Sequence, residues 1–159
     1  MIDPDDQSLD RIDRRILAEL QDHGRLSMVE LARRVNLTKT PCTERVRRLE
    51  RDGFIRGYAA RLDPDRLGSG HVAFVQVTLD RTTTDVFDRF HAAVRQVPEV
   101  QACHMIAGGF DYLLKVRTRD IAAYRQVLGD RIAALPGVQQ THTYVVMETV
   151  KDGAAVAVP

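Results

Sequence analysis

The sequence lacks the patterns on which most enzymes, secreted proteins and membrane proteins depend. Its two cysteines, Cys42 and Cys103, make no disulfide framework, and both lie among apolar residues where packing is the expected role. There is no signal peptide and no apolar run of about 18 residues, so we expect a cytoplasmic protein. The four histidines between residues 71 and 142 share no metal-ligand spacing with a cysteine or an acid, and no glycine-rich loop opens a helix to hold phosphate. These absences predict a protein with no catalytic site, no metal and no cofactor.

The charge of the chain is nearly balanced, but its basic residues are concentrated in one segment. The formal net charge is +1. Residues 25–61 carry ten Lys and Arg against four acids, whereas residues 1–24 carry three against seven and residues 62–159 carry ten against eleven. A basic surplus confined to one segment is typical of a nucleic-acid interface.

The basic segment begins with a short capped helix and a turn. Ser27 and Glu30 form a capping box, which predicts a helix start at Met28. Asn36 suits the turn that follows. A second helix starts directly after this turn, so the pattern predicts a helix-turn-helix over about residues 28–49.

The second helix carries hydroxyl and basic side chains on the face opposite its apolar residues. It can begin after Thr38 or after Thr40, and both starts place Pro41 in the first turn, where a missing N–H costs little. A solvated basic face would look similar, but the preceding capped helix and turn favour a helix that lies in the major groove of DNA. There Arg reads guanine edges, and Lys and Arg neutralise phosphates. The candidate DNA-binding residues are Thr38, Lys39, Thr40, Thr43, Glu44, Arg47, Arg48 and Arg51.

The flanking segments complete a first domain. An amphipathic helix over residues 9–20, capped by Asp10, supplies the third wall of a small core, and Gly53 ends the basic helix. The composition of residues 54–62 predicts a strand or short hairpin in the position of a wing. The turn-forming residues at 63–70 indicate a linker. The expected organisation is a flexible N-terminus at 1–8, a DNA-binding domain at 9–62, the linker at 63–70, a second domain at 71–151 and a flexible tail at 152–159.

The second half of the chain repeats one unit. VPEVQACH at 97–104 aligns with LPGVQQTH at 135–142, and the likeness extends back through the preceding helices. Two units of strand, helix, proline corner and strand predict a βαββαβ ferredoxin-like arrangement. The strands are expected at 71–79, 100–107, 112–117 and 140–150, and the helices at 85–96 and 121–135.

The strands look too apolar for a sheet with one wet face. In the first strand, Val72 and Phe74 alternate with Ala73 and Val75, so apolar side chains line both faces. Two helices cover only one face, and the other needs an apolar partner. We predict a dimer through this face.

The hairpin AGGFDYLL at 107–114 is a candidate ligand site. The backbone N–H groups of Gly108 and Gly109 can bind a carboxylate, and Asp111 can accept a hydrogen bond from an ammonium group. Together they can hold an α-amino acid. An ordinary hairpin with a turn stabilised by Asp111 explains the same residues.

These motifs together resemble one known family. LDRIDRRILAELQDHGRLS, TPCTERVRRLERDGFIRGYAARLDP, GGFDYLLKVR and LPGVQQTHTYVVMETVK are similar, in order and spacing, to segments of the Lrp/AsnC or feast/famine transcription factors over about residues 9–151. The resemblance implies an α+β protein with a winged-type helix-turn-helix domain followed by a βαββαβ domain of the RAM or ACT-like type. It also implies binding to double-stranded DNA, and dimers that assemble into octamers or similar rings.

The resemblance further implies an effector site between dimers, near the glycine hairpin and the last strand. This chain has Gly109 where the related hairpin reads G-D-F-D, and Lys39 and Thr43 are departures in the second helix. By motif, the effector residues are Met105, Gly108, Gly109, Phe110, Asp111, Tyr144, Val145 and Val146.

The sequence thus predicts a nucleoid-associated regulator of amino-acid metabolism whose DNA binding or oligomeric state responds to leucine or another amino acid. A dedicated local activator of one amino-acid catabolic operon is one alternative. A DNA-wrapping architectural protein with little effector response is another. An enzyme built on the second domain is disfavoured, because paired catalytic groups are lacking.

Overall fold

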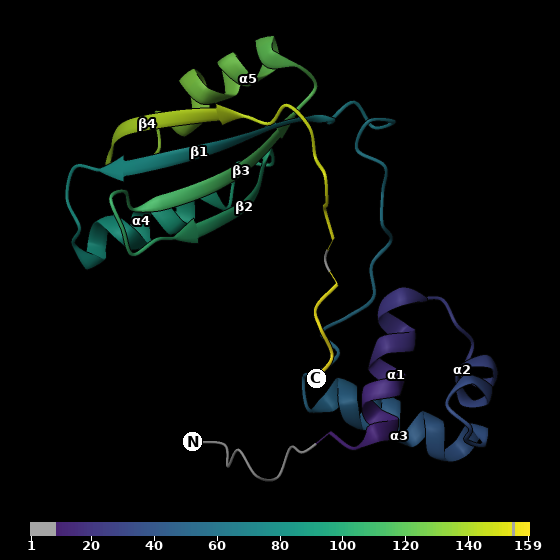
Figure 1. Cartoon of the computed structure of the whole chain (residues 1–159). Helices are drawn as coiled ribbons and strands as arrows, with labels where there is room; N and C mark the ends of the chain where they lie inside the picture. The colour runs from purple at the N-terminus through teal and green to yellow at the C-terminus, as the bar shows by residue number, and fades with distance from the viewer. Residues whose placement is uncertain (1–8, 154) are drawn as a thin grey trace. The chain divides into compact units, whose positions relative to one another are not determined.

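The computed structural model describes residues 9–153 and 155–159, which form two compact units. One unit holds the N-terminal part of the chain through Arg61 together with Lys151–Pro159, and the other spans Leu62–Val150. Figure 1 shows helices alone in the first unit and a sheet with helices in the second. The predicted flexible N-terminus at 1–8 lies outside the described residues.

Three helices form the first unit, and their apolar faces meet in one core. They are α1 (Arg11–Asp22), α2 (Met28–Arg34) and α3 (Lys39–Arg51). Ile16 of α1, Leu31 of α2 and Leu49 of α3 are fully buried in this core. Cys42 is buried beside them, which confirms its predicted packing role, and burial raises the pKa of its thiol.

Side-chain caps set where the first two helices begin. The Asp10 carboxylate accepts hydrogen bonds from two backbone N–H groups in the first turn of α1, both at 2.8 Å. The Ser27 hydroxyl accepts one from the N–H of Glu30 at 3.2 Å, and α2 starts at Met28 as predicted. The predicted Ser27–Glu30 capping box is only half formed. The Glu30 carboxylate accepts hydrogen bonds from arginines of α2 and not from the backbone N–H of Ser27. Of the two predicted starts for α3, the structure has the one after Thr38.

The predicted strand at residues 54–62 is wrong for the single chain. This segment adopts no helix or strand and is mostly exposed. Gly57 has a φ of 146°, and no described segment of the chain pairs with the backbone there. A strand is stable only where a neighbour takes up its N–H and C=O groups. The Tyr58 hydroxyl donates a hydrogen bond to Glu50 of α3 at 3.0 Å, and burial together with this carboxylate raises the Tyr58 pKa to about 12.

The second unit has the predicted βαββαβ order. Its sheet has the order β2-β3-β1-β4, and every neighbouring pair of strands is antiparallel. The elements are β1 (His71–Leu79), α4 (Thr84–Val94), β2 (Val100–Met105), β3 (Tyr112–Thr118), α5 (Ile121–Val127), a π-helical turn (Leu128–Ile132) and β4 (Val138–Val145).

Four predicted elements of the second unit end earlier than expected, α4 and β2 by two residues and the last helix and strand by more. The long helix over residues 121–135 gives way to the π-helical turn, in which the N–H of Ala133 donates to the carbonyl of Leu128 at 2.8 Å. The last strand ends at Val145 and not at residue 150. Its backbone makes one more hydrogen bond, from the N–H of Val146 to the carbonyl of Val72, and Met147 beyond it is fully exposed. The apolar residues after 145 therefore do not mark a continuing strand.

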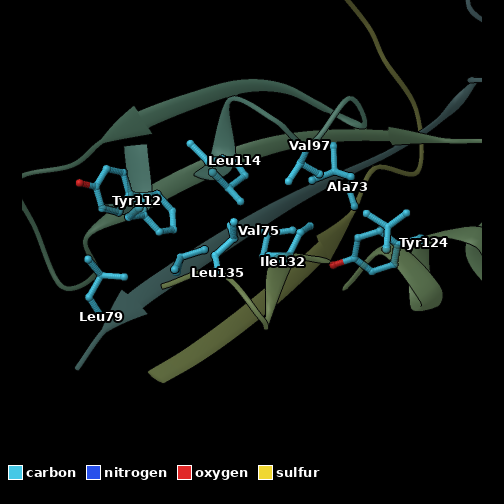
Figure 2. Packing of buried hydrophobic residues seen from close by; sticks show 14 of the residues in the cluster. Ala73, Val75, Leu79, Val97, Tyr112, Leu114, Tyr124, Ile132 and Leu135 are labelled. Carbon is cyan, nitrogen blue, oxygen red and sulfur yellow. The ribbon is translucent and has the colours of Figure 1, made fainter. Parts of the chain in front are cut away.

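One face of the sheet packs against the helices. Figure 2 shows Val75 and Leu114 of the sheet pointing toward Ile132 and Leu135, which follow α5. Tyr112 lies in the same core and stacks on Phe90 of α4, with ring centroids 4.3 Å apart. This layer fixes β1 and β3 at the centre of the sheet, and it therefore positions the hairpin that joins β2 to β3.

The other face of the sheet is more polar than the sequence predicts. Residues directly opposite each other in antiparallel strands share a face. Phe74 therefore lies beside Tyr144 and Lys115, while Gln76 lies beside His142 and Leu113. The expectation that apolar side chains line both faces holds only in part, because in β1 the polar residues Gln76 and Thr78 follow Phe74 on this side. Among the apolar residues of this face, Phe74 and Leu113 are half-buried and Tyr144 is exposed.

The predicted linker and tail both have defined contacts. In residues 63–70, the Asp63 carboxylate accepts hydrogen bonds from the N–H groups of Asp65 and Arg66, and the N–H of Ser69 donates to the carbonyl of Pro64 at 2.7 Å. This segment is therefore a folded turn at the start of the second unit. In the tail, the Gln21 amide exchanges two hydrogen bonds with the backbone of Val156, at 2.7 and 3.0 Å.

Candidate DNA interface and effector site

The exposed face of α3 carries side chains with no partner among the residues that the structure describes. Lys39, Thr40 and Arg47 are exposed, and within the described part of the chain the side chains of Lys39 and Arg47 make no hydrogen bond or ion pair. Arg51 is 71% exposed and only approaches its neighbour Asp52, at 3.5 Å. These cations are available to a ligand outside the protein.

The remaining polar residues of α3 extend this face toward its N-terminus. Thr38 and Glu44 are exposed. Thr43 is half-buried, and its hydroxyl donates to the carbonyl of Lys39 at 2.8 Å, which leaves its oxygen free to accept. The turn before α3 has the predicted form, since Asn36 takes a left-handed φ of 57° and the N–H of Leu37 donates to the carbonyl of Ala32. The fold therefore groups seven of the eight predicted DNA-binding residues on or next to one exposed surface.

Arg48, the eighth, is bound inside the unit. Its Nη2 donates to Oδ2 of Asp13, which belongs to α1 and is 1% exposed. Arg45 joins the same cluster, with Nη1 donating to Asp13 Oδ1 at 2.8 Å and to Asp10 Oδ2 at 2.6 Å. Neither Arg45 nor Asp13 is among the site residues predicted from the sequence. Asp13 lies three residues before Ile16 on the apolar side of α1, and an acid on a buried stripe is the signal that a cation must face it.

The arginines of α2 are also neutralised within the unit. Arg33 and Arg34 both donate to Glu30, and Arg34 also binds Glu19 of α1 at 3.0 Å. Hydrogen bonds from these two arginines lower the pKa of Glu30 to about 2. The positive charge left without an internal partner on the helix-turn-helix is therefore concentrated on α3.

The predicted effector residues divide between the two ends of the sheet. At one end, Met105 precedes the hairpin that contains Gly108, Gly109 and Phe110. Asp111 closes this hairpin, because its N–H donates to the carbonyl of Val77 and its Oδ2 accepts from the N–H of Leu79 at 2.7 Å. Asp111 thus stabilises the hairpin turn through Oδ2, which is the structural role that the sequence allows for it. Its Oδ1 has no partner among the described residues.

Tyr144, Val145 and Val146 lie at the opposite end, as Figure 1 shows for the hairpin and the tip of β4. Tyr144 pairs with Phe74, whereas Asp111 binds β1 at Val77 and Leu79. Those positions lie three to five residues further along β1, or roughly 10–17 Å at the rise of a strand. One chain therefore does not bring the two groups into a single site.

A surface cavity of about 390 Å³ lies beside the hairpin end of the sheet, between α4 and β2. Met105 is the predicted effector residue in its lining, which also includes Arg95 and Cys103. At its wall the Tyr112 hydroxyl and His91 Nε2 are 2.8 Å apart. Cys103 packs against the core, as predicted, and its burial raises the pKa of the thiol. The cavity includes neither glycine of the hairpin.

Neither a metal site nor a membrane span is visible in the described part of the chain. No three His, Cys, Asp or Glu side chains of residues 9–153 and 155–159 are placed to hold a metal ion. None of the described helices has the length and apolar character required to cross a bilayer.

A helix-turn-helix unit with an unpaired basic face, joined to a ferredoxin-like unit with a candidate ligand hairpin, defines a DNA-binding regulator with a ligand-binding domain. Two family profiles match these parts: a winged helix-turn-helix DNA-binding domain at residues 9–56, and an Lrp/AsnC ligand-binding domain at residues 72–156. The chain belongs to the Lrp/AsnC family of transcriptional regulators.

Known proteins are similar to this chain in sequence and in structure over nearly its whole length. The leucine-responsive regulatory proteins of Salmonella typhimurium and Escherichia coli K12 are each 57% identical over 145 residues, which cover 91% of this chain and 88% of theirs. A Neisseria meningitidis transcriptional regulator solved in complex with L-Met has a TM-score of 0.90 at 37% identity, covering 94% of this chain and 97% of that one. An AsnC family regulator from Agrobacterium tumefaciens has a TM-score of 0.89 at 34% identity, with the same coverage.

Proposed function

We propose that this chain binds operator DNA through α3 and responds to an amino acid bound by its second unit. The observation that carries the first half is the exposed face of α3, where Arg47 and Lys39 have no partner in the described chain. The second half is supported by the ligand-binding profile and by the relatives, which are named leucine-responsive or were solved with L-Met. Leucine is the first candidate effector and methionine the second.

In the proposed complex α3 lies in the major groove, with its N-terminal half nearest the base edges. Arg47 reads a guanine, and Glu44 accepts from a cytosine amino group. Lys39 and Arg51 neutralise phosphates. Hydroxyl groups contact bases or phosphates at the start of the helix, from Thr38, Thr40 and Thr43.

The proposed effector site is composite. The N–H groups of Gly108 and Gly109 bind the effector carboxylate, and Oδ1 of Asp111 accepts from its ammonium group. Met105, which is 54% exposed, contacts an apolar side chain. Phe110 belongs to the same hairpin. The residues from the tip of β4 complete the site from another subunit, because within one chain they lie at the far end of the sheet: Tyr144, Val145 and Val146.

This arrangement requires an oligomer. The open face of the sheet, with half-buried Phe74 and Leu113 and exposed Tyr144, is the proposed dimer surface, since partly exposed apolar groups on a mixed face suit a self-complementary contact. Contacts between hairpins of one dimer and β4 tips of the next then build a larger assembly, an octamer or a similar ring.

The proposed mechanism is linkage between effector binding and assembly. An amino acid that binds one oligomeric arrangement more tightly shifts the population toward it, which changes the spacing of the DNA-binding units. A typical coupling of about 1–3 kcal/mol changes operator affinity about 5- to 150-fold. The protein performs no catalysis in this mechanism, and its place is on the chromosome as part of the nucleoid.

Titration of single amino acids into an operator-binding assay, followed in parallel by sedimentation, tests this proposal. Leucine or methionine is expected to change both operator affinity and the sedimentation profile. Broad genomic binding separates a global regulator from a local activator of one catabolic operon. DNA bending that no amino acid alters favours the architectural alternative and contradicts the sensing half.

A further inference from the structure

The basic residues of α3 fall into two sets that differ in their partners. Arg47 and Lys39 have none within the described chain. Arg45 and Arg48 are held by the N-terminus of α1, where the Asp13 carboxylate receives one arginine on each oxygen. Asp13 is 1% exposed, while the arginine side chains are 28% and 43% exposed. The cations are thus near the surface and their anchor is buried.

The anchor is held firmly by its own surroundings. Oδ2 of Asp13 also accepts from the N–H of Asp10 at 3.2 Å, and Oδ1 of Asp10 accepts from the N–H of Asp13 at 2.8 Å. This reciprocal capping box fixes both carboxylates at the start of α1. Both then face Arg45, because Asp10 Oδ2 accepts from its Nη1 as well. The two acids and two arginines form one balanced cluster.

This arrangement matters for DNA binding because non-specific affinity grows with the number of Lys and Arg that reach phosphates, while sequence is read at the base edges. Arg48 lies about 100° around α3 from Arg47, on the flank of the proposed DNA-facing surface. A free guanidinium at this position would reach the DNA backbone regardless of sequence.

We infer that Asp13 is a specificity-determining residue, which holds Arg48 away from DNA phosphates so that α3 binds mainly through the contacts that depend on sequence. This inference rests on the proposed binding of DNA by α3. It also gives Arg48 a different role from the direct DNA contact that the sequence predicts.

The test compares binding of the full-length protein to a selected operator and to a scrambled duplex of equal length, across a salt series. Asp13→Asn keeps the shape of the side chain and removes its charge. We expect the log–log salt slope on the scrambled duplex to steepen by about 0.9 as Arg48 is released, and the operator preference to fall several-fold. Asp22→Asn, at the exposed end of α1, removes the same charge without releasing an arginine, and it should leave both values unchanged.

Arg48→Gln supplies a second arm that does not depend on Asp13→Asn folding. If Asp13 holds Arg48 away from DNA, replacing Arg48 by Gln leaves the salt slope on the scrambled duplex at the wild-type value. A slope flattened by about 0.9 would show that Arg48 already contacts phosphate and would overturn the inference. An unchanged slope in folded Asp13→Asn would overturn it as well. Failure of the wild-type protein to bind the operator would instead refute the proposed function.

Discussion

Asp111 offers a direct separation of a structural role from a ligand-binding role. Its Oδ2 accepts from the backbone N–H of Leu79 at 2.7 Å, at the end of β1, and Leu79 is only 4% exposed. Asp111→Ala leaves this N–H without an acceptor in a site that water barely reaches. An unsatisfied buried donor costs about 1–3 kcal/mol, so we expect the free energy of unfolding of the second unit to fall by that amount.

Asp111→Asn is the matched variant. Its side-chain oxygen still accepts from Leu79, but as a neutral group, and hydrogen bonds to neutral groups are about half as strong as those to charged ones. We therefore expect a loss below about 1 kcal/mol. The free oxygen of Asp111 is the proposed ammonium acceptor, and neutralising it should weaken leucine binding even though the fold is kept.

Urea unfolding followed by tyrosine fluorescence measures the first effect, because Tyr112, Tyr124 and Tyr144 lie in the second unit and only Tyr58 in the first. Calorimetric titration with leucine measures the second. Equal stability of the alanine variant and the wild type would refute the anchoring argument. Unchanged leucine affinity in the asparagine variant would remove Asp111 from the effector site.

Three further predictions concern DNA affinity, packing and pH. Arg47→Ala should weaken operator binding by about 1–3 kcal/mol and relax the sequence preference at one base pair. Binding to a set of single-base operator variants measures both effects. Equal weakening on all sequences would show that Arg47 contacts phosphate instead. Gly137 has a left-handed φ of 79°, and a Cβ added there would lie 2.6 Å from Val86. Because a left-handed φ and overpacking both cost energy, Gly137→Ala should lower the free energy of unfolding by about 2–5 kcal/mol. An unchanged midpoint of urea unfolding would contradict this. The N–H of Asp13 and the Arg45 guanidinium lower the pKa of Asp10 from 3.8 to about 2, so the stability that ionised Asp10 contributes is complete above pH 3.8 and is lost as the pH falls toward 2. The midpoint of thermal unfolding, followed by helical circular dichroism, should therefore drop less between pH 3.8 and 2 in Asp10→Asn than in the wild type. Equal drops in the two proteins would refute this contribution of Asp10.

The elements that short-range chemistry determines could be predicted from the sequence. Asp10 and Ser27 mark helix starts because their side chains cap N–H groups a few residues away. Asn36 and Gly53 take the left-handed turns expected of them. The 38-residue repeat likewise predicts the order of strands and helices in the second unit, since each repeated unit carries its own apolar pattern.

The features that depend on distant partners were missed or misjudged. Residues 54–62 have strand-like composition, but no described strand pairs with them. Asp13 and Arg45 are 32 positions apart, and no local pattern pairs them. The polar half of the open sheet face could have been predicted in part, because alternation along β1 places Gln76 on the side of Phe74; only its neighbour His142 depends on the register. The candidate effector residues form two groups, one at the hairpin and one at the end of β4, and the sheet of a single chain holds these groups apart.

The account depends most on coupling between the α3 surface and the amino-acid site, and reciprocal titration measures that coupling directly. Operator affinity is measured with and without saturating leucine, and leucine affinity is then measured with and without saturating operator. The account predicts that each ligand changes the affinity of the other by the same factor, about 5- to 150-fold. Operator affinity that stays constant with leucine, methionine and every other amino acid would contradict it.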